Sequence, residues 1–311
     1  MPRPALARPR IAVLLSTYNG AVYLPAQLES LRAQQDVSVV LHARDDGSTD
    51  ETCAILRGQA DRWPALATLA PSENLRPAAS FLRLLETAPD DADYFAFCDQ
   101  DDVWLPTKLA RAAAALAGVE GPALYCSNFT CVDADLAVLG TPAPHRDARL
   151  RHLIFENIAT GCTVVMNPAA RDLITSARPA SGAVMMHDWW CALVIAALGT
   201  VIYDPEPSLL YRQHGGNVVG LHANWAAQKL RQAVRLVRER EAVYPIYAQA
   251  SELLRLFGDR MPAIHRTCLE RLVATRRSWL ARAAYALSDQ IVHRDPLGKV
   301  AVRGLILAGW Y

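Results

Sequence analysis

Between residues 10 and about 120, short apolar runs alternate with segments of helical periodicity, and this alternation restricts the possible folds more than any other feature of the chain. The first run, RIAVLLSTYNG at residues 10–20, ends in polar residues and glycine, as a buried strand does where it enters a loop. Leu24, Leu28 and Leu31 follow at helical spacing. Because the links between segments are short, the pattern predicts an α/β fold with a parallel, doubly wound sheet flanked by helices.

Further segments extend this prediction beyond the first strand and helix. Ser48 and Glu51 fit a capping box, so a helix is expected from this point to about Trp63. Strands are expected near residues 66–70, 93–98, 123–133 and 160–167, and helices at 106–118 and 187–199.

The distribution of charge divides the chain into two parts. Residues 221–311 carry 15 Lys and Arg against 7 Asp and Glu, a net charge of +8, whereas residues 1–220 carry 17 against 24, a net charge of −7. Helical patterns dominate from residue 222 onward. We therefore expect a sheet-containing domain at 1–220 and a basic, mostly helical extension at 221–311.

Polar clusters follow three of the expected strands, at Thr17-Tyr18-Asn19, Asp45-Asp46-Gly47-Ser48 and Asp99-Gln100-Asp101-Asp102. Parallel strands bring such clusters to one edge of a sheet, where ligands of doubly wound folds bind. Carboxylates as close as those of Asp99 and Asp101 repel each other unless a cation lies between them. Mg²⁺ or Mn²⁺ suits such an all-oxygen site, and the alternative is an ordinary solvated turn.

Taken in order, LLSTYNG, ARDDGSTDET and FCDQDDVW with LPTKL after it resemble the inverting family-2 glycosyltransferases of the GT-A fold. The resemblance covers residues 10 to about 220 and implies a Rossmann-like, mainly parallel sheet. MHDWWCALV (186–194) and LLYRQHGGNVVG (209–220) resemble, more narrowly, bacterial rhamnosyltransferases that build surface polysaccharides. The activity implied is transfer of a sugar from a nucleotide-diphosphate donor to a hydroxyl group.

Site roles follow from the resemblance, residue by residue. The nucleotide would be bound by Thr17, Tyr18, Asn19, Asp46, Asp99 and Gln100, with Asp46 accepting from the pyrimidine N3–H and Asp99 near the ribose. Asp101 would bind the divalent metal, and His214, which precedes Gly215 and Gly216, would contact the metal or the diphosphate. Arg76, Trp189 and Trp190 are candidates for contact with the acceptor or the sugar.

Asp188, in HDWW, is the candidate general base that deprotonates the acceptor hydroxyl. A single displacement inverts the anomeric centre, so one catalytic carboxylate suffices. The alternative is that Asp188 caps the helix beginning near Trp189, and a helix N-terminus is expected to lower its pKa. The two tryptophans could equally be core residues, His214 a structural histidine, and Arg76 only a stiffener of its loop.

The resulting functional hypothesis is a metal-dependent, inverting glycosyltransferase that uses dTDP-rhamnose and a growing polysaccharide or a polyprenyl-linked acceptor. A nucleotidyltransferase and a non-catalytic nucleotide-sugar-binding protein remain as alternatives. No recognition motif accompanies the basic charge, so nucleic acid is not an expected partner.

The seven cysteines form no CxxC pair, and the N-terminal MPRPALARPR lacks the apolar core of a signal peptide, so a cytoplasmic protein is expected. In the basic extension, Arg231, Arg235 and Arg238 recur at helical spacing, and Arg276, Arg277 and Arg282 lie among Trp279, Leu280 and Tyr285. This pattern fits either the charged face of a packed helical subdomain or a peripheral contact with the inner, anionic face of the cell membrane.

Overall fold

The computed structural model describes residues 8–59, 63, 67–69, 73–145, 147–180, 182–214 and 246–311. The strands are β1 (Arg10–Thr17), β2 (Ser38–Asp45), β3 (Ala67–Leu69), β4 (Tyr94–Cys98), β5 (Val103–Trp104), β6 (Ala123–Val132), β7 (Val138–Gly140), β8 (Val165–Met166) and β9 (Thr200–Arg212). The helices before β9 are α1 (Leu24–Arg32), α2 (Thr52–Arg57), α3 (Arg76–Glu86), α4 (Lys108–Leu116), α5 (Leu150–Leu153), α6 (Pro168–Thr175) and α7 (His187–Leu198). After it come α9 (Ile246–Phe257), α10 (Ala263–Ala274), α11 (Trp279–Leu287) and α12 (Pro296–Ala308).

The strands form one sheet in the order β3-β2-β1-β4-β8-β6-β9-β5, with β7 paired to β6. The first four are parallel neighbours, as the alternation of strands and helices predicts. The short β8 is antiparallel to both β4 and β6, and β6 then pairs in parallel with β9. The α/β fold class is therefore confirmed. The sequence pattern did not predict the antiparallel pairings of β8, of β5 with β9 and of β7 with β6.

Helices cover both faces of the sheet, because successive side chains of a strand point to opposite sides. On β1, Ala12 and Leu14 pack into the cluster that includes α3, α6 and α7. The alternate residues Ile11, Val13 and Leu15 pack against α1, α2 and α4. Both faces of β1 are thus buried, as expected for a central parallel strand.

Two local predictions were wrong. Helix α2 begins at Thr52 and ends at Arg57, and Ser48 does not cap it, because its hydroxyl donates to the Asp45 carboxylate over 2.6 Å. Glu51 occupies the N-cap position without a side-chain hydrogen bond, and the Thr52 N–H donates to Asp50 at 3.0 Å. In the expected strand at 160–167, residues Gly161–Thr163 form a 3-10 turn and only Val165–Met166 pair as a strand.

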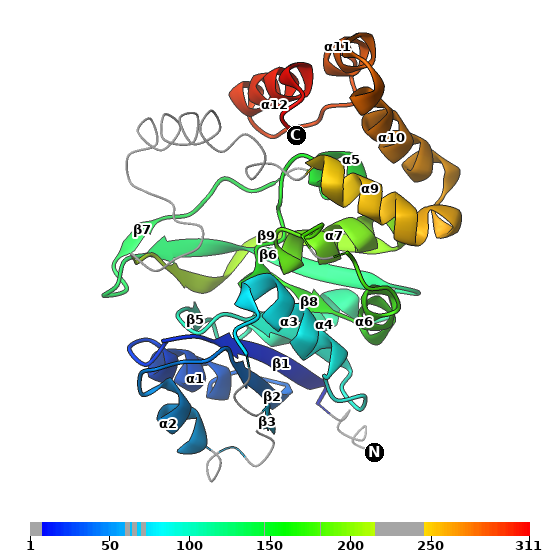
Figure 1. The fold of residues 1–311 in the computed structure, drawn as a ribbon. Coiled ribbons are helices and arrows are strands. Elements are labelled where there is room, and N and C mark those ends of the chain that lie inside the picture. Colours follow the sequence, from blue (N-terminus) through cyan, green and yellow to red (C-terminus); the bar gives the residue numbers. More distant parts are fainter. Residues whose placement is uncertain are drawn as a thin grey trace, which may run out of the picture.

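The C-terminal helices share a core with the sheet domain. Leu253 and Phe257 of α9 and Leu269 of α10 belong to the same buried cluster as Trp190 of α7. Figure 1 shows α9 beside α7, and α10, α11 and α12 at the end of the molecule farthest from β3. Within the described residues, every helix is too short or too polar to cross a membrane. The arginines at 231, 235 and 238 lie outside the described residues.

Candidate active site

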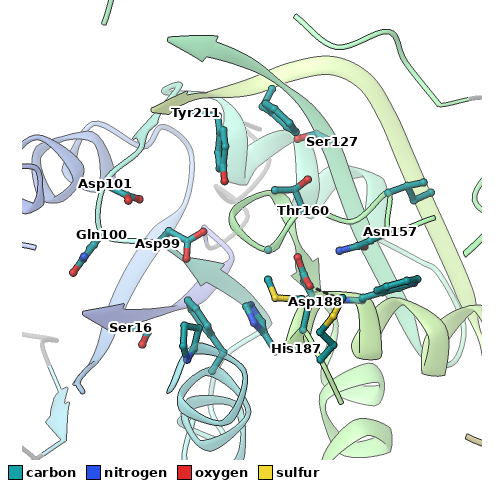
Figure 2. A pocket seen from close by; sticks show the side chains of 18 of the residues that line it. Ser16, Asp99, Gln100, Asp101, Ser127, Asn157, Thr160, His187, Asp188 and Tyr211 are labelled. Atoms are coloured by element: carbon teal, nitrogen blue, oxygen red, sulfur yellow. Dashed lines mark hydrogen bonds between the residues drawn. The ribbon is translucent and has the colours of Figure 1, made fainter. Parts of the chain in front are cut away.

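A pocket of about 770 Å³ opens at the carboxyl ends of β1 and β4 and extends to the start of α7. The polar residues lining it include Ser16, Thr17, Tyr18, Asp46, Arg76, Asp99, Gln100, Asp101, Asn157, Asp188, Tyr211 and Arg294. The three polar clusters of the sequence are therefore brought together here. Figure 2 shows Asp99 and Asp188 facing the same opening from two sides.

Gln100 fixes the loop after β4 to the loop after β1. Its side-chain amide accepts from the Tyr18 N–H and donates to the Tyr18 carbonyl, each over 2.9 Å. A Cβ at Gly20 would collide with this amide, which explains the glycine at that position. Tyr18 itself is half-exposed, so its ring is available to a ligand. The Gln100 amide is thus committed to the backbone of the pocket wall.

Asp45 and Asp46 have different surroundings although they are adjacent. Asp45 accepts from Thr17 Oγ1 at 2.8 Å and from the Ser48 N–H at 2.8 Å. Burial raises the pKa of Asp45, but these hydrogen bonds outweigh it and the net pKa is lowered. Asp46 pairs with Arg44 and accepts from the N–H groups of Leu75 and Arg76, each at 2.9 Å. Asp46 therefore holds the loop before α3 as well as lining the pocket.

Arg76 has a backbone φ of +65°, a conformation that L side chains rarely adopt. It opens α3 at the mouth of the pocket, with Pro77 next to it. The strain is maintained because the Arg76 N–H is held by Asp46. Arg76 is exposed and lines the pocket from the start of α3.

Asp99, Asp101 and Asp102 form an acidic group at the end of β4. Burial raises the pKa of Asp99 well above its ordinary value, and the charges of Asp101, Asp102 and Asp188 raise it further. Asp102 is fully buried and braces the site, because its Oδ1 accepts from the Arg212 N–H of β9 at 3.1 Å. His214 Nε2 lies 2.8 Å from Asp101 Oδ2, so the structure brings together the two predicted metal ligands. Gly215 and Gly216 lie outside the described residues.

The chemistry of this group fits a divalent cation. Several carboxylates that raise one another's pKa are stabilised by a positive ion. Among the described residues, the buried Oδ2 of Asp102 accepts from no nitrogen or oxygen donor, although the Cys162 thiol contacts the Asp102 carboxylate. Carboxylate oxygens with one imidazole suit Mn²⁺, and the oxygens alone suit Mg²⁺.

Asp188 lies in the first turn of α7, one residue after His187, and Met186 occupies the N-cap position. Its carboxylate is buried, and it accepts from the Trp189 N–H at 2.6 Å, from the Asn157 side chain and from the Gly161 backbone. Burial raises the pKa of Asp188 to about 6, although these hydrogen bonds lower it. The N–H groups at the start of α7 do lower the pKa of Asp188, as expected, but desolvation outweighs them and the net pKa is raised.

Three of the candidate site residues lie outside the pocket lining: Trp190, Asn19 and His214, of which His214 still contacts Asp101. Trp190 is fully buried in the core beside Cys191, so the expectation that it contacts a sugar is corrected. Trp189 lines the pocket, but its Nε1 donates to the Leu153 carbonyl at 2.6 Å. Asn19 is outside the lining and instead accepts from the Thr49 N–H at 2.8 Å.

Sequence reasoning missed several pocket residues. Asn157 orients Asp188 from a loop that has no clear pattern. His187 stacks on Phe81 with ring centroids 4.0 Å apart, and burial lowers its pKa to about 3, so this imidazole is neutral. Gly161 was a usable signal, because a Cβ there would lie 3.0 Å from His187 Nε2.

Residues 12–145 match the family described as Glycosyl transferase family 2. The chain carries a family-2 glycosyltransferase domain. The resemblance seen in the sequence motifs is thereby confirmed, and this domain contains the acidic group, whereas Asp188 lies beyond the matched residues.

Relatives that match about two thirds of the chain agree with this assignment. Over 232 residues the chain is 28% identical to the dTDP-rhamnosyl transferase RfbG of Shigella flexneri. This match covers 70% of this chain and 77% of the relative. It is 26% identical over 215 residues to an uncharacterized glycosyltransferase, alr2836, of Nostoc, covering 67% of this chain and 66% of the relative.

Solved structures show the same fold. The S. aureus TarS fragment 1–349 in complex with UDP-GlcNAc aligns with a TM-score of 0.60 at 15% identity, covering 97% of this chain and 82% of that one. The mannosyltransferase PcManGT from Pyrobaculum calidifontis, in complex with GDP-Man and Mn²⁺, aligns with a TM-score of 0.53 at 18% identity and covers 98% and 82%. The family-2 domain of this chain thus has the GT-A architecture that its motifs imply.

Proposed function

We propose that this chain is an inverting glycosyltransferase in which Asp188 is the general base. The observation that supports this most directly is a buried carboxylate with a pKa of about 6, held in the same pocket as the acidic group at Asp99 and Asp101. Such a group is mostly ionised at neutral pH and is still basic enough to accept a proton from a hydroxyl. The hydrogen bonds from Asn157 and Trp189 hold its carboxylate in one orientation.

The transfer is a single displacement. Asp188 accepts the proton of the acceptor hydroxyl while the hydroxyl oxygen bonds to the anomeric carbon. The bond from that carbon to the nucleoside diphosphate breaks at the same time. The sugar's configuration inverts, and the nucleoside diphosphate leaves with the electron pair. The separation of roles supports this scheme, since the donor end of the pocket contains Asp46 and Asp99 and the base lies at the start of α7.

Asp101 and His214, with Asp99 beside them, would hold a Mg²⁺ or Mn²⁺ ion. When bound, such an ion neutralises charge that develops on the leaving diphosphate. Tyr18 would contact the nucleotide base with its exposed ring, and Arg76 would meet the diphosphate or the acceptor.

The favoured donor is dTDP-rhamnose, and the similarity to a dTDP-rhamnosyl transferase supports this choice. The favoured acceptor is a saccharide, either on a growing polysaccharide or on a polyprenyl diphosphate. A polyprenyl-linked acceptor would place the enzyme at a membrane surface as a peripheral protein.

The test is a screen of nucleotide sugars by thermal shift with Mn²⁺, because a ligand that binds only the native state raises the melting temperature. We expect dTDP-rhamnose to give the largest shift. Asp101→Ala should weaken Mn²⁺-dependent binding of dTDP at least tenfold by calorimetry, while the control Asp90→Ala, whose side chain is exposed, should not. An unchanged metal requirement in Asp101→Ala would remove this residue from the metal site.

A further inference from the structure

Helix α12 presents an apolar face to solvent as well as to the core. Val302, Leu305 and Ile306 are buried. The exposed residues of the same helix recur at helical spacing, and all of them are apolar or glycine: Pro296, Leu297, Val300, Ala301, Gly304, Leu307 and Ala308. Leu297 and Val300 are 59% and 64% exposed. A surface helix normally turns charged and polar residues toward solvent, so this stripe is unusual.

Helix α11 continues the apolar surface. Leu280, Ala284 and Leu287 are exposed at helical spacing, and Leu280 is 72% exposed. Trp279 at its start is exposed as well. Helices α11 and α12 contact each other, and Figure 1 shows them at one end of the molecule. We call the exposed residues of these two helices the α11–α12 face.

Positive charge predominates around this face, although Asp289 follows α11 and Asp295 precedes α12. Neither α11 nor α12 contains an acidic residue, whereas Arg282, Lys299 and Arg303 lie within them. Over residues 276–311 there are six Lys and Arg and two Asp, a net charge of +4. Arg277 is exposed two residues before the first residue of α11. Apolar side chains bordered by arginine and lysine complement an anionic bilayer surface, where the apolar groups enter the interface and the cations meet lipid phosphates.

We propose that the α11–α12 face docks this protein on an anionic lipid bilayer. Trp279 and Trp310 are exposed or partly exposed at its edges, and tryptophan is enriched at membrane interfaces. Arg294, which lines the active-site pocket, lies two residues before the first residue of α12. Docking therefore brings the pocket close to the membrane. The functional value of that position rests on the proposed transfer to a lipid-linked acceptor. The docking itself does not depend on that activity.

The experiment measures co-sedimentation of the full chain with vesicles, without nucleotide or metal. Vesicles of phosphatidylcholine mixed with phosphatidylglycerol should bind the protein, and vesicles of phosphatidylcholine alone should bind it much less. Raising the salt concentration should release it, because each cation near the surface contributes about fivefold in affinity that salt screens.

A pair of matched double variants locates the contact. Leu280→Glu with Val300→Glu should lower the partition coefficient by about 20-fold, because it places two like charges against the anionic surface. The control is Val138→Glu with Leu139→Glu on β7, where both side chains are also exposed, at 70% and 54%. This control adds the same charge and should leave binding within about twofold of wild type.

Three results would overturn the proposal. The first is absence of vesicle binding by the wild-type protein, and the second is an equal loss of binding from the two double variants. The third is a dimer in analytical ultracentrifugation that only the α11–α12 variant dissociates, which would assign the face to a second copy of the chain. Failure of the transferase assay alone, with vesicle binding intact, would count against the proposed function and not against docking.

Discussion

Replacing Asp188 by asparagine is expected to make the protein more stable at neutral pH while abolishing transfer. The folded protein raises the pKa of this carboxyl from 3.8 to about 6, chiefly by burial. Above pH 6 the folded state therefore holds a buried negative charge that the unfolded chain exposes to water. Asparagine has nearly the same shape and carries no charge.

The size of the effect follows from the shift of about two pKa units, at about 1.36 kcal/mol for each, which gives about 3 kcal/mol. Part of this gain in stability is lost, because asparagine replaces one accepting carboxylate oxygen with an NH₂ group. That NH₂ group then faces the Gly161 N–H or the Asn157 side chain. One conflicting donor costs about 1–2 kcal/mol. A net gain of about 1–2 kcal/mol remains, which corresponds to a rise of about 3 °C in melting temperature.

The sign depends on pH. Well below pH 3.8 the carboxyl is protonated in both states, so asparagine has no advantage and keeps only the cost of its conflicting donor. Between pH 4 and 6 the folded state retains a proton that the unfolded state releases, and the wild-type protein loses stability as the pH rises. The difference in stability between Asp188→Asn and wild type should therefore be negative at pH 4 and positive from pH 6 upward.

Thermal melts of both proteins at intervals between pH 4 and 8 measure this difference, and a product assay with the best nucleotide sugar measures transfer. Because both proteins share every other titrating group, subtraction isolates Asp188. A variant that is less stable than wild type at pH 7.5, or a difference that does not change between pH 4 and 6, would refute the assignment of a desolvated carboxylate at this position. Retained activity would remove Asp188 as the base.

Two further predictions concern neighbours of the same pocket. The kcat/KM of transfer should fall below pH 6 as Asp188 becomes protonated. Because Asn157 lowers the Asp188 pKa, Asn157→Ala should move this acidic limb of the pH profile to higher pH by up to about one unit. An acidic limb that does not move would show that Asn157 does not orient the base. Arg76→Gly should be more stable than Arg76→Ala by about 1 kcal/mol in urea denaturation, because only glycine relieves the φ of +65° while both variants lose the guanidinium. Equal midpoints for the two Arg76 variants would contradict the strained backbone.

Most of the donor side of the pocket could be predicted from the sequence. The apolar runs before Thr17, Asp46 and Asp99 indicate parallel strands, and parallel strands end at one edge of a sheet. Residues far apart in the chain are thereby expected to meet, and the structure places all three in one pocket. The roles assigned to them remain proposals.

The acceptor side could not be predicted in the same way. Asn157 and Gly161 belong to a loop and a 3-10 turn, whose geometry depends on contacts with α7 and not on a periodic pattern. Trp189 and Trp190 are adjacent and chemically identical, yet only Trp189 lines the pocket, because successive residues of a helix point about 100° apart. The rotation of α7 about its axis decides which one faces the ligand.

The sequence by itself determined the main alternation of strands and helices up to about residue 120, the family, and the acidic group that follows β4, because these depend on local apolar periodicity and on residues that are near neighbours in the chain. Only the tertiary structure decided that burial raises the pKa of Asp188, since desolvation depends on every segment packed around a group. It alone also decided which side of α12 meets the core. Leu297, Val300, Leu305 and Ile306 are equally apolar in the sequence, and only packing against the neighbouring helices buries the last two and leaves the first two exposed.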